Sequence, residues 1–413
     1  MDTITKKVED MYSQFPFPSH QGPMSTLSWF YDLDLLLASV GSHKAIDKIR
    51  VLDAGCGTGE EVVCCASVFP QAHFTAVELN STSLGIAKKN AKYLEVENID
   101  FHKNNIMDIT NELGSFDVII SSGVIHHLSN PEEGLKRLVN LLEPDGVLAI
   151  YLYCEYTRDR NIRIKQAVNM VEGDQGLVDK RIKIARALSN KYEWTDIKAV
   201  DAFLHVNEHL YTAKSIFDML RECGLKFLRF RDEPIWDASI LIKDTDVVSM
   251  LRNLPNDLHY EVLDLAFSEQ RNRNAYEFFT CHDSYVSHPV KEIGKDKLEF
   301  YPMRAPHVQI EKEVSDNGLF NANILHDNKQ TVQLKLSNQA VDIIMKCDGQ
   351  KSLGKILEET TGGPENNPAH QEMEGQIFQL LNLALKRDLI YIRPVPSGKV
   401  WDKYKMVDFT KAS

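Results

Sequence analysis

Residues 49–153 alternate short apolar runs with amphipathic stretches, and this pattern restricts the fold more than any other feature of the chain. The apolar runs are predicted strands, at 49–55, 73–79, 98–104, 116–122 and 146–153. The helices predicted between them span 59–68, 81–94 and 131–142. Pro131 and the acidic residues after it are typical of a helix N-terminus. Alternating strands and helices form a parallel sheet that helices cover, so we expect an α/β fold.

A glycine-rich turn follows the first predicted strand directly. The stretch VLDAGCGTG (51–59) has glycine at 55, 57 and 59. Several kinds of nucleotide cofactor bind such turns, but the dinucleotide fingerprint is GxGxxG, whereas the spacing here is GxGxG. No Lys or Arg stands in this turn to meet a phosphate. The turn therefore favours a ligand without phosphate.

Polar side chains stand at the ends of the first three predicted strands. Glu78 ends the second strand, where a carboxylate can accept both hydrogens of a ribose diol. Asn105 follows the third strand and could bond an adenine edge, with Ile106 against the face of the ring. Asp53, at the tip of the first strand, suits an ammonium group. Together these side chains describe an adenosine with a zwitterionic amino-acid tail, which is S-adenosylmethionine.

Three stretches resemble, in order and spacing, the successive motifs of class I S-adenosylmethionine-dependent methyltransferases. They are VLDAGCGTG, VEL and FDVIISSGVIHHLSNPEEGLKRLVNLLEPDGVLAIYLY, within about 105 residues. The resemblance implies a Rossmann-like core with a mostly parallel seven-stranded sheet. It also implies cofactor contacts from the loops at the strand ends, at Asp53, Gly55, Cys56, Gly57, Gly59, Glu78, Leu79, Asn105, Ile106, Ser121 and Ser122. One of the two serines would lie beside the methionine tail. The family more often has Asp where Asn105 stands, and Asn can still accept from the adenine amino group.

Methyl transfer is an in-line displacement, for which an enzyme supplies alignment and, for a protonated acceptor, a base. His127 follows the fourth strand and is either a packing residue that bonds to the loop or the base. Four other candidates are predicted to line the substrate side of the cleft, at Glu155, Tyr156, His205 and Glu208. A carboxylate in this position would suit an amine acceptor, which must lose a proton before it attacks. Tyr12, in an N-terminal segment that could close over the cofactor, is a fifth candidate. The stretch HVNEH (205–209) has the spacing of a zinc motif, but no third ligand is recognisable, so no metal is predicted.

The N-terminal stretch MYSQFPFPSHQG interleaves aromatic residues with two prolines. Pro16 and Pro18 favour an extended segment. With Tyr12, Phe15 and Phe17, such a segment could close over the cofactor, or it could be an apolar strap against the core.

The sequence divides into five predicted units. These are an N-terminal strap (1–42), the cofactor-binding core (43–155), a helical substrate lid (156–212), the end of the core with a helical extension (213–290) and a winged-helix-like α+β domain (296–395). A helix, a glycine cap at Gly224 and a strand are predicted near the start of the fourth unit. The pattern of 245–290 predicts helices. In the last unit, three strands precede helices at 337–346, 352–360 and 371–387 and a strand at 389–394.

The outer parts of the chain loosely resemble two groups of proteins. Residues 335–393 are similar to winged-helix modules that bind leader peptides. Together with the N-terminal stretch, they also resemble multidomain bacterial protein-lysine methyltransferases. Residues 296–395 carry 11 Lys and Arg against 14 Asp and Glu, which argues against nucleic-acid binding. A role in homodimerisation, or a purely structural one, is the alternative for this unit.

Composition sets further limits. The net charge is −12, no window of 18 apolar residues occurs, and the N-terminus lacks an apolar signal region. We therefore expect a cytoplasmic protein without membrane or nucleic-acid partners. The seven cysteines form no CxxC pair, which suits a reducing compartment, and adjacent Cys64 and Cys65 are predicted to be buried hydrophobes.

The sequence thus predicts an S-adenosylmethionine-dependent methyltransferase whose acceptor is an amine on a protein or peptide. The absence of a (D/N)PPY stretch after the fourth strand weakens adenine-N6 and glutamine-amide methylation. O- or N-methylation of a small molecule is the first alternative. A non-catalytic regulator that binds S-adenosylmethionine is an alternative of another class.

Overall fold

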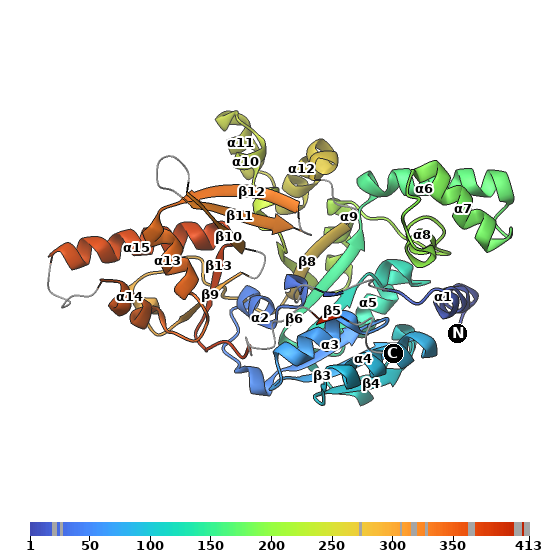
Figure 1. The fold of residues 1–413 in the computed structure, drawn as a ribbon, viewed down its shortest axis with the longest axis horizontal. Helices are drawn as coiled ribbons and strands as arrows, with labels where there is room; N and C mark the ends of the chain where they lie inside the picture. The colour runs from blue at the N-terminus through green and yellow to red at the C-terminus, as the bar shows by residue number, and fades with distance from the viewer. Residues whose placement is uncertain are drawn as a thin grey trace.

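The computed structural model describes residues 1–18, 23–24, 28–271, 275–305, 308–314, 320–326, 329–361, 368–399 and 407–408. Its centre is a seven-stranded sheet with the order β4-β3-β2-β5-β6-β8-β7 (Figure 1). The strands are β2 (Arg50–Ala54), β3 (His73–Glu78), β4 (Ile99–Lys103), β5 (Phe116–Ser122), β6 (Leu142–Tyr153), β7 (Leu225–Phe230) and β8 (Ala275–His282). Neighbouring strands are parallel except at β8, which runs antiparallel to β6 and β7. The predicted α/β class with a mostly parallel seven-stranded sheet is confirmed.

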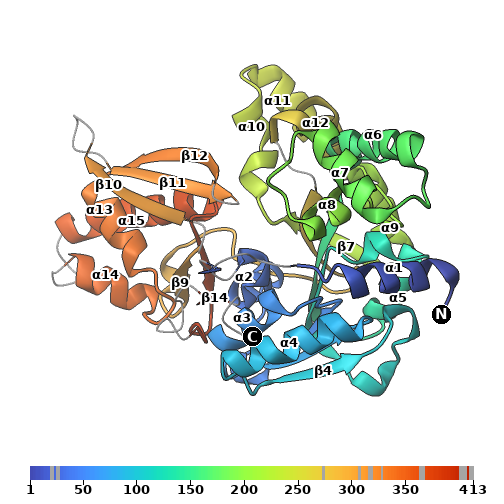
Figure 2. The same ribbon diagram turned by 45° about the vertical axis from the view of Figure 1, so that its right-hand side comes forward.

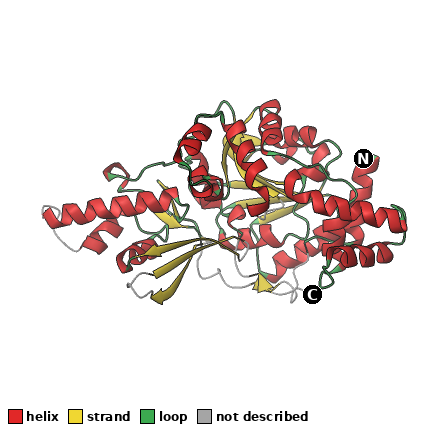
Figure 3. Ribbon diagram, turned by 90° about the horizontal axis from the view of Figure 1, so that it is seen from above, coloured by secondary structure: helices red, strands yellow, loops and turns green. Residues whose placement is uncertain are grey.

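Helices cover both faces of the sheet (Figure 3). Successive side chains of a strand point to opposite faces. On β5, Val118 and Ile120 join one hydrophobic core and Ile119 joins the other. The first core includes α2 (Leu33–Val40), α3 (Glu60–Val68) and α4 (Ser81–Tyr93). The second includes α5 (Pro131–Val139), α9 (Ala213–Glu222) and α12 (Asn256–Arg271).

The predicted helix–glycine–strand sequence near residue 224 is confirmed. Helix α9 begins with a capping box between Thr212 and Ser215. Gly224 follows the helix with a φ of +69°, a left-handed conformation that glycine adopts without strain, and β7 begins at the next residue.

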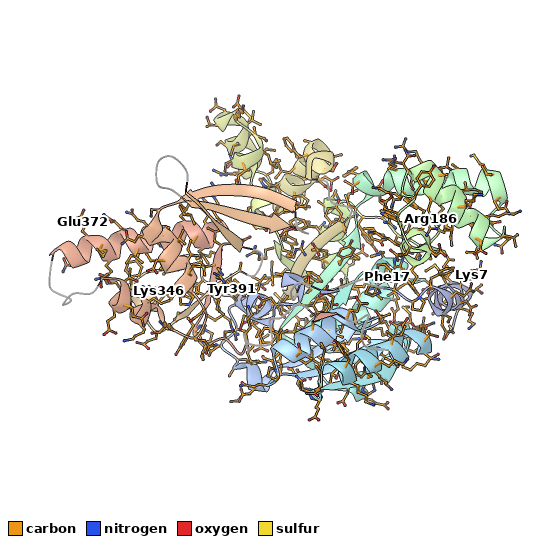
Figure 4. The ribbon with its side chains drawn as sticks, in the orientation of Figure 1. Lys7, Phe17, Arg186, Lys346, Glu372 and Tyr391 are labelled. Atoms are coloured by element: carbon orange, nitrogen blue, oxygen red, sulfur yellow. The ribbon has the colours of Figure 1, made fainter. Side chains whose placement is uncertain are left out.

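Residues 3–14 of the N-terminal segment form a helix instead of an extended strap, whereas residues 15–18, which include the two prolines, are not helical. Helix α1 (Thr3–Gln14) lies between α4 and the helices of residues 155–203 (Figure 2). The prolines act only from residue 16 onward, beyond the end of the helix. Asp2 caps α1 by accepting from the Thr5 amide at 2.9 Å. Tyr12 therefore projects from a helix, while Phe17 lies between α1 and the sheet (Figure 4).

Three helices form the segment predicted as a lid, α6 (Glu155–Glu172), α7 (Val178–Ser189) and α8 (Asp196–Phe203). They have a small core of their own, which includes Val168, Ala185 and Phe203. Met11 of α1 joins this core. The lid and α1 therefore pack as one layer.

The segment between β7 and the C-terminal unit contains α10 (Ala238–Leu241), α11 (Thr245–Arg252), α12 and β8. The prediction that 245–290 is helical is wrong for residues 275–282, which form β8. This strand lies between β6 and β7, so both of its edges are paired, and residues 278–281 are buried on both faces. A strand buried on both faces has no polar alternation, and its pattern cannot be told from that of a buried helix.

The C-terminal unit lies at the opposite end of the molecule from the lid (Figure 1). Its strands β10 (Val308–Val314), β11 (Phe320–His326) and β12 (Lys329–Leu336) form an antiparallel sheet. Helices α13 (Asn338–Lys346), α14 (Leu353–Thr361) and α15 (Pro368–Lys386) follow. Strand β13 (Ile390–Arg393) pairs with β9 (Tyr301–Arg304), and β14 (Val407–Asp408) pairs with β1 (Pro23–Met24). The predicted elements occur in the predicted order, but β9 precedes them and was not predicted, and the winged-helix assignment stays a prediction.

A buried charge cluster fixes the C-terminal unit to the core. Lys399 donates to Asp32 at 2.6 Å, and Arg393 donates to Asp34 at 2.7 Å. The Tyr391 hydroxyl also donates to Asp32, at 2.7 Å. The side chains of both ion pairs are at most 1% exposed. Removing one member would leave a buried charge unpaired, so the C-terminal unit is an integral part of the fold.

Short 3-10 turns connect the larger elements. They are η1 (Trp29–Tyr31), η2 (Ile46–Lys48), η3 (Ile106–Asp108), η4 (Asn111–Leu113), η5 (Ile125–His127), η6 (Glu233–Trp236) and η7 (Lys295–Lys297). All seven cysteines are buried and unpaired, Cys64 and Cys65 among them, as predicted. Among the described helices, none combines the length and apolar character that a membrane span needs.

Candidate active site

A cavity of about 1000 Å³ lies at the carboxyl ends of the parallel strands, beneath α1 and α8. Ligands bind at this edge in open α/β sheets. Most of its wall comes from the turns after β2, β3, β4 and β5, from α1 and from the lid. The lining residues include Glu9, Tyr12, Phe17, Gly55, Cys56, Gly57, Glu61, Glu78, Leu79, Asn105, Ile106, Ser122, His127, Tyr151, Tyr153, Arg158, Asn161, Trp194, Lys198 and Asp201. We call the part formed by residues 53–122 the cofactor end and the part formed by α1, β6 and the lid the acceptor end.

Two of the three glycines border the cavity. Gly57 has a φ of +54°, and a Cβ there would meet the Phe17 carbonyl oxygen at 2.4 Å. The same turn holds Phe17 and Pro18, because the Thr58 hydroxyl donates to the Pro18 carbonyl at 2.7 Å. Gly59 has another role, since its Cβ would meet Ala87 of α4 at 2.6 Å. The glycines therefore let the N-terminal segment approach the turn and let α3 approach α4.

Glu78 lies at the cavity wall, where the sequence predicts a side chain that binds the ribose. Its two carboxylate oxygens accept from the backbone amides of Gly57, at 2.9 Å, and Asn80, at 2.8 Å. These bonds hold the carboxylate at the cavity wall, beside Leu79. Burial raises the pKa of Glu78, and the amide bonds oppose this shift. A fixed carboxylate with free lone pairs fits a vicinal diol.

Asp53 lies behind the cavity wall. It is 1% exposed, and the Tyr31 hydroxyl donates to it at 3.4 Å. Burial raises the pKa of Asp53 to about 8. Of the two serines, Ser122 lines the cavity, whereas Ser121 is fully buried and donates to the Ala54 carbonyl at 3.4 Å.

Asn105 and Ile106 both line the cavity, but the Asn105 side chain is already engaged. Its Oδ1 accepts from the Met107 amide at 3.2 Å, and its Nδ2 donates to Asp108 at 3.1 Å. Asn105 thus caps η3. The bond between its side chain and adenine stays a prediction.

The residues present fit S-adenosylmethionine. Glu78 faces the cavity, as a carboxylate that binds a ribose diol must, and Asp53 lies just behind the cavity wall. The basic side chains among the lining residues, Arg158 and Lys198, both belong to the lid, so the glycine turn faces none of them. A phosphate would find no counter-charge there.

Histidines and a tyrosine meet at the acceptor end. His127 lines the cavity, and its Nδ1 donates to the Asn207 carbonyl at 2.7 Å. His205 stacks on His127, with ring centroids 3.6 Å apart. The Nε2 of His205 lies 3.1 Å from the Tyr12 hydroxyl. Burial lowers the pKa of His127 to about 3, so its ring is neutral at physiological pH. Both interpretations of His127, packing residue or base, remain open.

Glu208 forms a buried ion pair instead of lining the cavity. It accepts from Arg158 at 2.5 Å, and each side chain is 4% exposed. The Arg158 guanidinium also lies over the Tyr153 ring, 3.7 Å from its centroid. Among these predicted wall residues, His205 and Glu208 lie behind the surface and position Tyr12 and Arg158, which face the cavity.

The prediction that Glu155 and Tyr156 line the cleft is wrong. Each residue of a helix turns by about 100°, and Arg158 and Asn161 define the inward face of α6. Tyr156 lies on the opposite face and donates to Glu261 of α12 at 2.7 Å. Glu155 is exposed in the first turn of α6.

The spacing of HVNEH brings no metal ligands onto one helical face, because α8 ends at Phe203. Donor atoms of His127, His205 and Glu208 do lie within 4.8 Å of one another. Arg158, however, already supplies the positive charge beside Glu208. We therefore infer no metal centre from this cluster.

The structure adds acceptor-end residues that the sequence reasoning missed, namely Asp201, Arg158, Tyr153 and Trp194. One signal existed for Arg158, which continues the buried stripe of α6 formed by Ile164 and Val168. A charge on such a stripe needs a partner. For Asp201 the helix pattern gives no signal, because it points away from the apolar face of α8.

Comparisons with known proteins agree with this geometry. A family model described as a methyltransferase domain matches residues 46–203. An uncharacterised protein from a Synechococcus strain, syc1184_c, is 26% identical over 67% of this chain and 72% of its own length. A malonyl-[acyl-carrier protein] O-methyltransferase from Halalkalibacterium halodurans is 28% identical over 40% of this chain and 65% of its own length, so the match covers less than two thirds of that relative.

Two solved structures of PKMT2 from Rickettsia typhi, the second in complex with AdoHcy, have the same fold. Their TM-scores are 0.66 and 0.65, with 15% and 16% identity, and they cover 92% and 91% of this chain and 77% of theirs. The likeness therefore includes the lid and the C-terminal unit. At this identity the likeness shows the Rossmann-like fold alone, and it is residues 46–203 that match a methyltransferase domain.

Proposed function

We propose that this methyltransferase transfers the methyl group of S-adenosylmethionine to an amine on a protein or peptide. When bound, the cofactor supplies a methyl carbon that its sulfonium activates. The chain's own residues hold the cofactor and align and deprotonate the acceptor. In this proposal Glu78 binds the ribose diol and Asp53 the ammonium group.

The charge of the cavity carries the proposal. Five carboxylates line it, Glu9, Glu61, Glu78, Glu193 and Asp201, against two basic side chains, Arg158 and Lys198. The ion pair with Glu208 compensates Arg158. An excess of negative charge attracts a cationic acceptor and disfavours an anionic one.

Aromatic residues at the acceptor end support the same acceptor class. Tyr12, Tyr153 and Trp194 line this part of the cavity. Aromatic faces attract ammonium groups and pack against the alkyl chain of a lysine side chain. The fold shared with PKMT2 extends over 92% of this chain.

The C-terminal unit contributes none of the described residues that line the cavity. If it helps to present the acceptor, as the sequence predicts, it binds a part of the protein or peptide far from the reacting nitrogen. We also propose that the chain is divided into the five units that the sequence predicts.

One observation favours a second candidate, a carboxylate acceptor on a small molecule or carrier protein. The Arg158 Nε is buried without a hydrogen-bond partner, although the side chain lines the cavity. A guanidinium with a free donor can bind a carboxylate. The relative from Halalkalibacterium halodurans is named as an O-methyltransferase of malonyl-[acyl-carrier protein].

The two candidates give chemically different products. The full chain is incubated with methyl-labelled S-adenosylmethionine and either a cell extract or lysine-rich peptides. We expect base-stable label on macromolecules, which acid hydrolysis releases as methylated amino acid. Base-labile label that is released as methanol would show a methyl ester and contradict the amine proposal. Label confined to small molecules would contradict the protein acceptor. Glu78→Gln, which we expect to bind the cofactor more weakly, provides the matched control.

A further inference from the structure

Asp201 belongs to α8, but its carboxylate takes no part in the apolar packing of this helix. It lines the acceptor end, on the side of α8 away from the buried Ala199, Val200 and Phe203. The hydroxyls of Tyr12 and Tyr153 donate to its carboxylate, the former at 3.4 Å. A partly buried carboxylate is unfavourable unless it has such donors.

The hydrogen bonds around Tyr12 have a fixed direction. The Asn207 amide donates to Nδ1 of His205 at 3.1 Å, so Nδ1 carries no proton. Burial keeps His205 neutral by lowering its pKa well below the ordinary value, and its single proton is therefore on Nε2. His205 then donates to the Tyr12 oxygen at 3.1 Å, and Tyr12 donates its own proton to Asp201.

In this direction, Asp201 is the final acceptor in the series of hydrogen bonds that runs from His205 through Tyr12. The Tyr12 oxygen already accepts from His205, and burial raises the pKa of the tyrosine well above its ordinary value. Tyr12 is therefore unsuited to be a base. A carboxylate can accept about four hydrogen bonds, so two tyrosine donors leave room for an ammonium N–H.

The groups that face Asp201 come from four elements. They are Tyr12 of α1, Tyr153 of β6, Arg158 of α6 and Glu208 after α8. Burial raises the pKa of Asp201 to about 6, while Arg158 and the tyrosines oppose the shift and Glu208 adds to it. Asp201 is therefore mostly ionised above pH 7, as a base must be.

We propose that Asp201 is the base that deprotonates the acceptor ammonium, an inference that rests on the proposed amine acceptor. Its carboxylate takes one proton from R–NH3⁺ and leaves R–NH2. The amine lone pair then bonds the methyl carbon while the carbon–sulfur bond breaks and its electron pair stays on sulfur. The product is R–NH2⁺–CH3, and Asp201 returns its proton to solvent.

The test is the pH profile of kcat/KM for the full chain with an amine acceptor. The wild type should show an acidic limb near pH 6. Asp201→Asn should lose this limb and lower kcat about 100-fold or more, with cofactor affinity unchanged. Asp196→Asn is the matched control, because Asp196 begins the same helix and pairs with Arg186. It should keep the wild-type rate and profile.

A second variant keeps the proposal testable if Asp201→Asn does not fold. Tyr12→Phe removes one hydrogen bond to the ionised carboxylate, so the acidic limb should move to higher pH. A wild-type rate and limb in Asp201→Asn, or an unmoved limb in Tyr12→Phe, would overturn the inference while the amine product stands. A wild-type product that is a base-labile ester would overturn the proposed function instead, and the inference with it.

Discussion

The two ends of the cavity are built in different ways. At the cofactor end, Glu78 bonds to the backbone amides of Asn80, 2 residues away, and Gly57, 21 residues away. At the acceptor end, Arg158 pairs with Glu208, 50 residues away, and Tyr12 contacts His205, 193 residues away. Backbone amides therefore fix the side-chain position at the cofactor end. At the acceptor end, the side chains are fixed by buried partners from distant elements.

This difference has an energetic consequence. A side chain fixed by backbone amides can be changed without disturbing another side chain. A buried network of side chains is coupled, and removing one member leaves its partner unsatisfied. We therefore expect substitutions at the acceptor end to lower the stability of the protein and those at the cofactor end to lower ligand affinity.

The largest effect is expected for Glu208→Gln. It leaves the Arg158 guanidinium, which is 4% exposed, without its anionic partner. Breaking a buried ion pair from one side costs about 3–5 kcal/mol of the free energy of unfolding. Urea denaturation measures this loss. The double variant Arg158→Met/Glu208→Leu should recover most of it, because no charge is then buried alone. A loss below about 1 kcal/mol would show that the pair behaves like a surface ion pair.

Glu78→Gln should weaken cofactor binding about 100-fold and lower stability by about 1–3 kcal/mol, because Gln has one acceptor oxygen for the two backbone amides that bond to Glu78. Hydrogen bonds to a charged group contribute about 1.5–3 kcal/mol each, and the substitution removes the charge beside the ribose. Calorimetry with S-adenosylhomocysteine measures the affinity. Glu97→Gln is the control, since this exposed carboxylate lies just before β4. Equal affinities in the two variants would contradict the ribose role.

The cofactor end could largely be predicted from the sequence, because each residue follows a strand in a short contiguous stretch. Strand ends meet at one edge of a parallel sheet, so Glu78 and Ser122 could be placed without knowing any other part of the fold. Two details could not be predicted from the sequence. Gly59 allows α3 to pack against α4, and Asn105 caps η3. The spacing of the motif gives no signal of either contact.

The acceptor end could be predicted only as a list of candidates. Which face of α6 turns inward depends on how the lid packs on α1, and a shift of two residues separates Arg158 from Tyr156. Asp201 was missed because its role comes from Tyr12, which is 189 residues away. Helix periodicity reports which side of a helix is apolar and says nothing of a polar side turned into a cavity.

Asp53 provides a smaller, pH-dependent test of the cofactor end. Burial raises the pKa of Asp53 to about 8, so the carboxyl is mostly protonated at pH 7 in the cofactor-free protein. Its contribution to folding stability is therefore lost as pH rises toward 8. A cofactor ammonium requires the ionised form, so binding at pH 7 should release a proton, and affinity should rise with pH until the ammonium itself loses its proton.

Calorimetry in buffers of different ionisation enthalpy counts the released protons. Asp53→Asn should bind more weakly than the wild type at pH 9 and without this pH dependence. An unchanged slope in Asp53→Asn would assign the titration to another group.

The smallest effect is expected for Asp2→Ala, which tests whether α1 supports only the acceptor end of the cavity or both ends. Asp2 caps this helix by accepting from the Thr5 amide, and Ser129 donates to it at 3.0 Å. Asp2→Ala should cost about 1 kcal/mol of helix stability, because the N-cap bond is lost. Amides of α1 should then exchange about fivefold faster. The KM for the acceptor should rise by no more than the same factor, because Tyr12 is held less often in place.

Asp2→Asn is the matched control, since Asn caps helices as well as Asp does and should restore both values. Cofactor affinity is the discriminating measurement. Helix α1 also accepts from Asn80, through the Glu9 carbonyl at 2.9 Å, and this contact joins it to the turn beside Glu78. If Asp2→Ala weakens cofactor binding as much as it raises the acceptor KM, the helix couples the two ends, and ordering of α1 by the cofactor would then prepare the acceptor end for its substrate.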